Sequence, residues 1–308
     1  LAVRETAAST RFRCVQALRR SCASLGLSET INWSLVSSGD LARIGGPQAL
    51  QLANPLSQDH AHLRPSLLIG LLHVVRRNVA RGAARVCAFE LGQVFSPGRE
   101  PAERLRLGLV LSGVWARDWQ GTQACDFFRL KGLIELLASR WVGVSIGMRQ
   151  TDAPWSEPGQ GADVLVNGQP LGDIGQVARR IVEALDIEQD VWFAELDAET
   201  LLGSWDQARS VQSPIAFPPV RRDVSLVVAD TIPFEEIDRV IREVGGPLAV
   251  RIELIDRYAG RQTPPGKHSL TFSIEYRDRA RTLTAEAVDA LHRCIGQALV
   301  SRFAAQLR

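Results

Sequence analysis

The stretch Leu270-Thr271-Phe272-Ser273-Ile274-Glu275-Tyr276 decides the fold of the C-terminal part of this chain, because apolar and polar residues alternate along it without a break. This period of two places the four apolar side chains on one face and predicts a half-buried β-strand. A strand of this kind needs neighbours, and the sequence on both sides supplies them.

The residues before this strand predict a strand, a helix and a second strand. Residues 223–229 form the first strand. Pro233 then opens a helix that carries acidic residues in its first turn, where they interact favourably with the helix dipole, and glycines at 245 and 246 end it. A second strand follows at residues 250–254, where apolar residues again alternate with polar ones.

The residues after residue 276 complete a familiar order of elements. Thr284 is placed to cap a long helix with one apolar stripe, and residues 304–308 can add a short final strand. The order β-α-β-β-α-β predicts a ferredoxin-like domain, in which both helices cover one face of an antiparallel sheet. The opposite face of that sheet is then free to bind a partner.

The N-terminal part of the chain predicts an α+β fold with a mostly antiparallel sheet. Helices are expected over residues 10–25, over 66–81 and from Phe127, strands over 31–35, 50–53, 86–95, 105–111 and 191–196, and a hairpin turn at Asn167-Gly168. The pattern weakens at residues 204–219, where serine and proline gather. We therefore expect one domain at residues 1–208 and a second at residues 209–308.

The composition excludes several classes of protein. The 308 residues include 36 Lys or Arg and 34 Asp or Glu, so the net charge is only +2, unlike that of a protein that coats nucleic acid. The residues from Ile215 onward hold 14 of these basic and 12 of these acidic residues, so the whole excess lies in the predicted ferredoxin-like domain. No apolar run approaches the ~20 residues that span a bilayer. Five scattered cysteines without a CxxC pair fit reduced thiols in a cytoplasmic protein.

Short segments of both domains carry a family resemblance. In the second domain they are Phe217-Pro218-Pro219-Val220-Arg221-Arg222-Asp223, Asp256-Arg257-Tyr258-Ala259-Gly260, Gly266-Lys267-His268-Ser269-Leu270 and Arg281-Thr282-Leu283-Thr284. Together these resemble the ferredoxin-fold anticodon-binding domain of the bacterial phenylalanyl-tRNA synthetase β subunit. The first domain resembles the class II synthetase-like, catalytic-like module of the same subunit in Asn54-Pro55-Leu56-Ser57, Leu63-Arg64-Pro65-Ser66-Leu67-Leu68, Phe89-Glu90-Leu91-Gly92-Gln93-Val94-Phe95 and Asp126-Phe127-Phe128-Arg129-Leu130-Lys131-Gly132.

The resemblance implies a function within a larger assembly. The family's β subunit is much longer, and this chain does not begin with Met, so we expect a C-terminal portion of that subunit. The implied partners are a catalytic α subunit in an (αβ)2 heterotetramer and tRNA(Phe), with no membrane and no DNA. The intact enzyme would use ATP and Mg²⁺, whereas this chain would bind no cofactor or metal by itself. The implied location is the cytoplasm.

The sequence argues against catalysis by this chain. A class II active site needs an arginine for the ATP α-phosphate, in an Arg-x-Glu strand motif, and a second arginine after a late glycine motif. The corresponding strand here reads Phe89-Glu90-Leu91, without an arginine two residues before the glutamate, and Gly172 and Gly175 lack the second arginine. We therefore expect no catalytic residue. The residues that we assign to the α-subunit interface or to structural roles are Arg64, Glu90, Phe127 and Phe128.

The second domain contains the candidate RNA-binding residues. Unpaired anticodon bases can stack on aromatic rings, and the only tyrosines of the chain, Tyr258 and Tyr276, lie in predicted strands of this domain. The resemblance implicates Asp256 and Tyr258 in reading the anticodon. Their direction stays open because Ile255 interrupts the alternation, whereas Tyr276 continues the apolar face and is expected in the core. The basic residues expected to contact phosphates are Arg222, Arg261, Lys267, Arg277 and Arg281, each with a solvated surface charge as its alternative.

Two other functions stay open at this point. One is a stand-alone RNA-binding or regulatory relative without an α partner. The other is a single-chain synthetase, which the missing arginines oppose. A metal corner at Asp59, His60 and His62 is a weak third signal, because two histidines two residues apart need further ligands.

Overall fold

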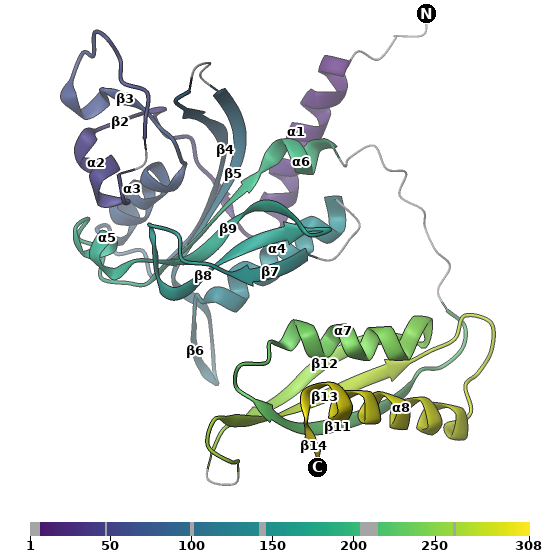
Figure 1. The fold of residues 1–308 in the computed structure, drawn as a ribbon. Coiled ribbons are helices and arrows are strands. Elements are labelled where there is room, and N and C mark those ends of the chain that lie inside the picture. Colours follow the sequence, from purple (N-terminus) through teal and green to yellow (C-terminus); the bar gives the residue numbers. More distant parts are fainter. Residues whose placement is uncertain (1–6, 47, 99–101, 142–145, 204–214, 261–262) are drawn as a thin grey trace, which may run out of the picture. The chain divides into compact units, whose positions relative to one another are not determined.

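The computed structural model describes residues 7–46, 48–98, 102–141, 146–203, 215–260 and 263–308 (Figure 1). The chain divides into two compact units, Leu1–Ala208 and Arg209–Arg308. The expected boundary between residues 208 and 209 and the candidate Arg261 lie outside the described residues. Among the residues that are described, no helix has both the length and the apolar character needed to cross a membrane.

The first unit is built on one large sheet. Its strands lie in the order β1-β4-β5-β10-β9-β8-β7, with β6 paired to β5, and β1 is parallel to β4 whereas the other pairs are antiparallel. The strands are β1 (Ser28–Glu29), β4 (Arg85–Ser96), β5 (Ala102–Asp118), β6 (Gly121–Ala124), β7 (Ile146–Gln150), β8 (Ser156–Val166), β9 (Gln169–Val177) and β10 (Val191–Asp197). A separate small ladder pairs β2 (Leu35–Val36) with β3 (His62–Leu63).

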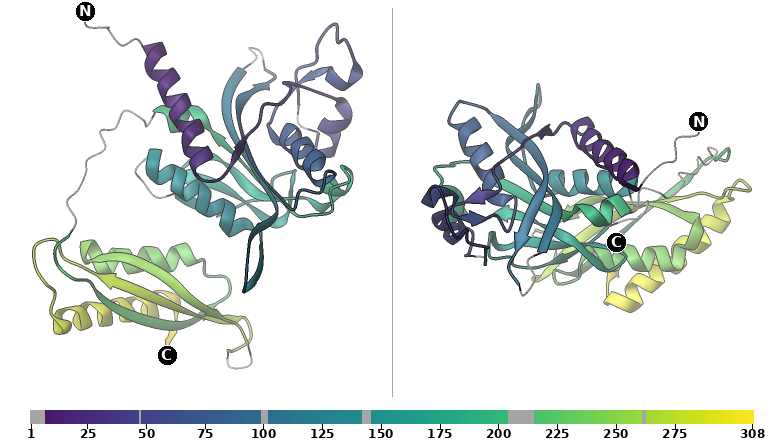
Figure 2. Two further views of the ribbon diagram at one scale, coloured as in Figure 1. Left: turned by 180° about the vertical axis from the view of Figure 1, so that it is seen from behind. Right: turned by 90° about the horizontal axis from the view of Figure 1, so that it is seen from above.

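Helices cover both faces of this sheet (Figures 1 and 2). On one face, Phe89 and Leu109 share a core with α1 (Ala7–Ser24), α4 (Phe127–Trp141) and α6 (Ala198–Gly203). On the other face, Ala88 and Val110 share a core with α2 (Ser38–Arg43), α3 (Leu68–Val79) and α5 (Arg179–Glu183). The period-two alternation of β4 and β5 therefore supplies two apolar layers from the same strands.

Glycine lets α3 lie close to the centre of the sheet. A Cβ atom at Gly108 of β5 would lie 2.8 Å from Leu71 Cδ1 and 3.1 Å from Leu67 Cβ. Any larger residue would push the helix away from the strand, because protein interiors are packed at crystal density. Because α3 lies so close, its side chains fill the space above the middle of this face of the sheet.

The second unit confirms the predicted order β-α-β-β-α-β. Its elements are β11 (Val220–Ala229), α7 (Phe234–Gly245), the short 3-10 helix η2 (Gly246–Leu248), β12 (Ala249–Tyr258), β13 (Lys267–Tyr276), α8 (Ala285–Phe303) and β14 (Gln306–Leu307). The antiparallel sheet has the order β12-β13-β11-β14. Both helices contribute to one core with Phe272 and Ile274, and Thr284 Oγ1 caps α8 by accepting from the backbone N–H of Ala287.

The strand predicted at residues 31–35 is wrong. Ile31 and Trp33 are 89% and 76% exposed, and the backbone between them and β2 forms no ladder. Asn32, the polar residue of the alternation, faces inward because its side-chain Nδ2 donates to buried Glu90 Oε2 at 2.7 Å. The strand predicted at residues 50–53 reduces to one isolated bridge between Gln51 and His62, beside the 3-10 helix η1 (Gln58–His60).

The predicted core position of Tyr276 is confirmed, because its side chain is fully buried. Its hydroxyl lies 2.9 Å from His292 Nδ1, and His292 Nε2 lies 3.2 Å from the carbonyl oxygen of Asp223. A carbonyl can only accept, so Nε2 carries the proton and Nδ1 accepts from the tyrosine hydroxyl. Burial lowers the pKa of His292, which favours the neutral imidazole that this pair of hydrogen bonds requires.

The lowered pKa of His292 predicts a loss of stability in acid. Because the folded-state pKa of His292 lies below its ordinary value near 6.5, the unfolded chain binds more protons as the pH falls. The second unit should therefore lose stability as the pH drops below about 6.5. Thermal unfolding from pH 7.5 to pH 5 should show a smaller decline for His292→Gln than for the parent chain. Equal declines would contradict the assignment.

Candidate functional site

The pairing register of the second unit defines a helix-free face of its sheet, opposite α7 and α8 (Figure 1). Side chains of paired residues point to the same side, so Ser225, Thr271 and Asp256 form one row across three strands, and Val227, Ser269 and Tyr258 form the next. Ser225 Oγ and Thr271 Oγ1 lie 2.8 Å apart within the first row. The other residues of this face are Arg221, Asp223, Arg251, Glu253, Ser273 and Glu275.

A β-bulge at Ile255 sets the direction of the two candidate RNA-reading residues. Leu254 still pairs with Phe272, on the helix side, but after the irregularity Asp256 pairs with Thr271 and Tyr258 pairs with Ser269. The extra residue reverses the parity of the strand. Asp256 and Tyr258 therefore both lie on the helix-free face, and Tyr258 is 40% exposed.

Gly260 holds the Tyr258 ring at the end of β12. A Cβ atom at Gly260 would lie 2.5 Å from Tyr258 Oη, so the ring packs against the glycine backbone. Thr263 also bonds to Gly260, because its Oγ1 accepts from the Gly260 N–H at 3.0 Å and donates to the Gly260 carbonyl at 2.7 Å. An aromatic ring fixed in this way loses little side-chain entropy when a base stacks on it.

The structure brings only some of the predicted basic residues to this face. Lys267 pairs with Ala229, two residues before Ser269, and so lies on the helix-free side at the Tyr258 end of the sheet. Arg222 pairs with Ile274 on the helix side, where its Nε donates to Asp289 Oδ1 of α8 at 2.8 Å.

The two remaining described arginines serve local structure. Arg277 donates from Nε to the Phe217 carbonyl at 2.7 Å and from Nη2 to the Ile215 carbonyl at 2.8 Å, which fixes the segment that enters β11. Arg281 donates to Asp278 at 3.3 Å in the turn that follows β13. That turn lies at the opposite end of β13 from the residue that pairs with Tyr258.

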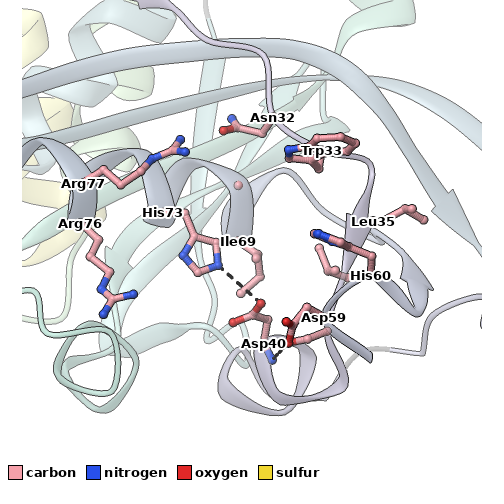
Figure 3. A pocket seen from close by; sticks show the side chains of 13 residues that line it. Asn32, Trp33, Leu35, Asp40, Asp59, His60, Ile69, His73, Arg76 and Arg77 are labelled. Carbon is pink, nitrogen blue, oxygen red and sulfur yellow. Dashed lines mark hydrogen bonds and ion pairs between the residues drawn. The ribbon is translucent and has the colours of Figure 1, made fainter. Parts of the chain in front are cut away.

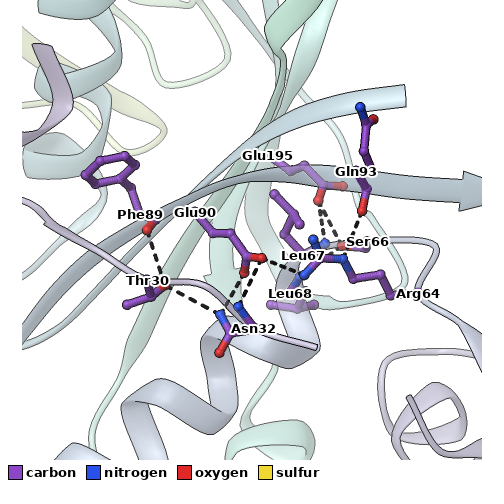
Figure 4. Close-up of polar contacts among 10 residues, drawn as sticks. All are labelled: Thr30, Asn32, Arg64, Ser66, Leu67, Leu68, Phe89, Glu90, Gln93 and Glu195. Atoms are coloured by element: carbon purple, nitrogen blue, oxygen red, sulfur yellow. Dashed lines mark hydrogen bonds and ion pairs between the residues drawn. The ribbon is translucent and has the colours of Figure 1, made fainter. Parts of the chain in front are cut away.

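A buried ion pair joins distant parts of the first unit (Figure 4). Arg64 Nη1 donates to Glu90 Oε1 at 2.6 Å, and Arg64 Nε donates to the Gln93 carbonyl at 2.9 Å. Both charged residues are almost completely buried, at 3% and 2% exposure. The Asn32 backbone and side chain also donate to the Glu90 carboxylate, and a Cβ atom at Gly92 would lie 2.3 Å from Arg64 Nη2. The pair therefore needs glycine at position 92.

A second carboxylate holds the start of α3 (Figure 4). Glu195 Oε1 of β10 accepts from the Leu67 backbone N–H at 2.6 Å and from Ser66 Oγ at 3.2 Å. Burial raises the pKa of Glu195 to about 7, and these two hydrogen bonds act in the opposite direction. Residues 64–68 are thus attached to β4 by one carboxylate and to β10 by another.

A cavity of about 340 Å³ lies between α2, α3 and the segment that contains Trp33 (Figure 3). Trp33 stacks on His60 with ring centroids 5.7 Å apart, and His73 Nε2 lies 3.4 Å from Asp40 Oδ2. The hydrogen bond from His73 lowers the pKa of Asp40. Sequence reasoning missed this cavity, because it placed Trp33 in a half-buried strand.

The structure brings no further ligand to the possible metal corner at Asp59, His60 and His62 among the described residues. His60 is the stacking partner of Trp33, and across the described ranges no group of three His, Cys, Asp or Glu side chains is arranged to hold a metal ion.

The two phenylalanines at the start of α4 differ in exposure. Phe127 packs in the core edge against Trp192, with ring centroids 6.4 Å apart in an edge-to-face arrangement. Phe128 is 75% exposed. Of these two phenylalanines, Phe128 is the one that offers a large apolar surface to a partner.

A mostly antiparallel sheet with helices on both faces, followed by a ferredoxin-like unit, defines a class II aminoacyl-tRNA synthetase type of fold. A pyrrolysyl tRNA synthetase from Desulfitobacterium hafniense has a similar structure, with a TM-score of 0.50 over 65% of this chain and 71% of that one. The sequence identity is 18%, so this likeness speaks for the fold alone.

Residues 2–198 match the phenylalanyl tRNA synthetase beta chain CLM domain, and residues 216–308 match the ferredoxin-fold anticodon binding domain. The chain belongs to the phenylalanyl-tRNA synthetase β-chain family. Similar proteins named phenylalanine–tRNA ligase beta subunit occur in Moorella thermoacetica, with 35% identity over 96% of this chain and 38% of the relative, and in Bacillus subtilis, with 35% identity over 94% and 37%. The Xanthomonas axonopodis relative is 36% identical over 89% of this chain and 35% of its own length. The chain thus spans little more than a third of these relatives.

The buried ion pair predicts a large cost for a small change. Glu90→Gln should destabilise the first unit by about 3 kcal/mol, because it leaves the buried Arg64 charge without a counter-ion. Urea denaturation would measure the change in the free energy of unfolding. Asp186→Asn, which breaks the exposed pair with Arg76, is the matched control and should cost below about 1 kcal/mol. Equal costs would contradict a structural role for Glu90.

Proposed function

We propose that this chain acts within the β subunit of a phenylalanine–tRNA ligase, where it gives a non-catalytic scaffold for the α subunit and binds the tRNA anticodon stem. The observation that carries the proposal is the order of two family matches along one chain, a catalytic-like domain followed by an anticodon-binding domain. We infer the reaction, ligation of phenylalanine to its tRNA, from the name that the relatives share. The intact enzyme would be a cytoplasmic (αβ)2 assembly that uses ATP and Mg²⁺. A stand-alone RNA-binding relative is not favoured, because the relatives are named as ligase subunits.

The first unit supports the scaffold role. Two residues before Glu90, where the class motif has its arginine, β4 has Ala88, and the nearby Arg64 is neutralised by Glu90. Leu67 and Leu71 of the α3 layer pack directly on Gly108 at the centre of the sheet. These described residues of β4, β5 and α3 therefore do not fit ATP or its metal, and we assign adenylate formation to the α subunit.

The exposed apolar residues of the first unit suit contact with that subunit. Of the four residues proposed for interface or structural roles, Arg64, Glu90 and Phe127 serve the fold, and Phe128 is left for a partner. Trp33 and Leu56 add further exposed apolar surface, at 76% and 106% exposure. Aromatic residues are enriched at protein interfaces, which suits Phe128 and Trp33 as contact residues.

The helix-free face of the second unit supports the RNA-binding role. Tyr258 offers a fixed ring on which an anticodon base can stack, and Asp256 beside it can accept from a base amino or imino group. Lys267 at the same end of the sheet can meet a phosphate. We leave Arg222, Arg277 and Arg281 out of the proposed contact surface because their guanidinium groups bond within the fold.

Substitution of Tyr258 tests this surface. Tyr258→Ala should weaken binding of the tRNA(Phe) anticodon stem-loop by about tenfold or more, because stacking on an aromatic ring is worth ~1–3 kcal/mol per base. Tyr258→Phe should keep most of the affinity, since it keeps the ring. Fluorescence anisotropy with labelled RNA measures both.

Arg222→Gln is the charge control, because this residue lies on the helix side of the sheet. The affinity of Arg222→Gln for the anticodon stem-loop should change less than that of Tyr258→Ala. Unchanged affinity in Tyr258→Ala, with the circular dichroism spectrum intact, would remove Tyr258 from the site.

A further inference from the structure

A small cavity in the first unit lies where the entry to α3, the end of α2 and the loop before β8 meet over β10. Its volume is about 160 Å³. A cavity of about 150 Å³ admits a ligand of the size of benzene, so this one suits a small organic molecule. Its walls are mostly apolar, with Ile44, Pro65, Leu68 and Pro154, and Glu195 of β10 is the one charged side chain among the described residues that line it.

The walls of this cavity are fixed to one another by Arg180 of α5. Arg180 Nη1 donates to the Arg43 carbonyl at the end of α2 at 2.8 Å, and Nη2 donates to the Pro154 carbonyl at 2.6 Å. A Cβ atom at Gly45 would lie 2.7 Å from Pro154 Cβ, so the two segments are in direct contact. The cavity is therefore formed before any ligand enters, which reduces the entropy lost on binding.

The Glu195 carboxylate has one oxygen bound to the fold and one that can still accept a hydrogen bond. Oε1 accepts from the Leu67 backbone N–H and from Ser66 Oγ (Figure 4). Among the described residues, Oε2 has no hydrogen-bond donor. The Arg106 guanidinium, which acts on Glu195 through space, is paired with Asp197 at 3.4 Å. When Glu195 is ionised, its negative charge therefore has no ion pair of its own within the described part of the unit.

The walls suit the organic part of a cation. The Trp155 ring is held edge-to-face against Phe193, with ring centroids 5.2 Å apart, and the face of an indole ring attracts cations. The prolines and Leu68 offer surface to methylene groups. Glu195 would repel an anion, and a neutral ligand would leave the carboxylate charge uncompensated. An organic cation is the ligand class that satisfies all of these groups.

We propose that this cavity binds a small primary alkylammonium ion, with its nitrogen at the Glu195 carboxylate and its alkyl chain against the apolar walls. An ammonium group has three N–H donors and no acceptor, which matches a carboxylate with an unused oxygen. A free amine and the side chain of a lysine from another protein share this chemistry. The cavity lies in the first unit, away from the proposed RNA-binding face, so the inference does not rest on the proposed function.

A titration with n-butylammonium chloride at pH 8.5 tests the proposal, with 1-butanol as a neutral probe of similar size. Nuclear magnetic resonance of the tryptophan indole N–H groups follows binding at Trp155, and Trp119, which is 91% exposed between β5 and β6, is the internal reference. We expect a saturable shift of the Trp155 signal with the ammonium ion. The alcohol should bind about tenfold more weakly or less, because hydrogen bonds from charged donors are roughly twice as strong.

A second probe distinguishes the two sources of the ammonium group. Binding of Nα-acetyl-lysine amide would support a lysine of another protein, and binding of n-butylammonium alone would support a free amine. Absence of saturation by both amines, or equal binding of the alcohol, would overturn the proposal.

Substitution of Glu195 tests its assigned role. Glu195→Gln keeps an oxygen that accepts from the Leu67 N–H but removes the charge, so the affinity for n-butylammonium should fall about tenfold or more. Asp173→Asn is the matched control, because Asp173 pairs with Glu195 across β9 and β10 but does not line the cavity. This control should bind like the parent chain. Unchanged affinity in Glu195→Gln would overturn the proposal.

The pH dependence of binding gives a measurement that needs no variant. Burial raises the pKa of Glu195 to about 7, and the protonated acid cannot attract a cation. The affinity of the parent chain should therefore fall about tenfold from pH 8.5 to pH 6, where about a tenth of the carboxylate is ionised. The other charged groups that act on Glu195 are Arg106 and Asp173, and arginine does not titrate in this range. Asp173→Asn should show the same fall, and a constant affinity in the parent chain would contradict the proposal.

Discussion

The buried pair of Arg64 and Glu90 is the interaction on which the first unit depends. Two charges taken out of water cost several kcal/mol each unless nearly every donor and acceptor is matched. Here the arginine reaches both a carboxylate and the Gln93 carbonyl, and the carboxylate also receives both N–H groups of Asn32. The pair therefore fixes three separate segments at once: the entry to α3, strand β4 and the segment that precedes β2. The α3 layer, with its close approach to Gly108, follows from that attachment.

The same pair also bears on function, because it leaves Arg64 unable to bind an ATP phosphate. A synthetase active site keeps arginines free for the charge that develops on ATP phosphates. In this chain the strand that corresponds to the catalytic one has Ala88 where the class motif has its arginine, and the Glu90 carboxylate binds Arg64. Glu195 repeats the pattern on β10, where it receives the N–H at the start of α3. Polar groups that an enzyme would direct toward its substrate are directed here toward the fold, which suits a module that supports a catalytic partner.

The sequence predicted the second unit well because each of its elements has a complete local signal. The alternation of residues 270–276, the capped helix at Thr284 and the glycines after residue 244 each agree with the final architecture. The strand predicted around Trp33 was wrong for the opposite reason, because its local signal disagrees with its long-range contacts. It alternates like a strand, but its polar residue, Asn32, has a buried partner 58 residues away, and that contact turns Ile31 and Trp33 outward. The direction of Tyr258 was likewise beyond sequence reasoning, since the bulge at Ile255 is defined only by pairing with β13.

We propose that this chain supports aminoacylation without performing its chemistry. Phenylalanine-dependent ATP–pyrophosphate exchange is the measurement to make, with the chain alone and after mixing with a candidate α subunit from a close relative. We expect no exchange above background for the chain alone, at any concentration of ATP or Mg²⁺, and exchange only when the α subunit is present. Measurable exchange by the purified chain alone, abolished by Arg64→Ala in a protein that still folds, would contradict it.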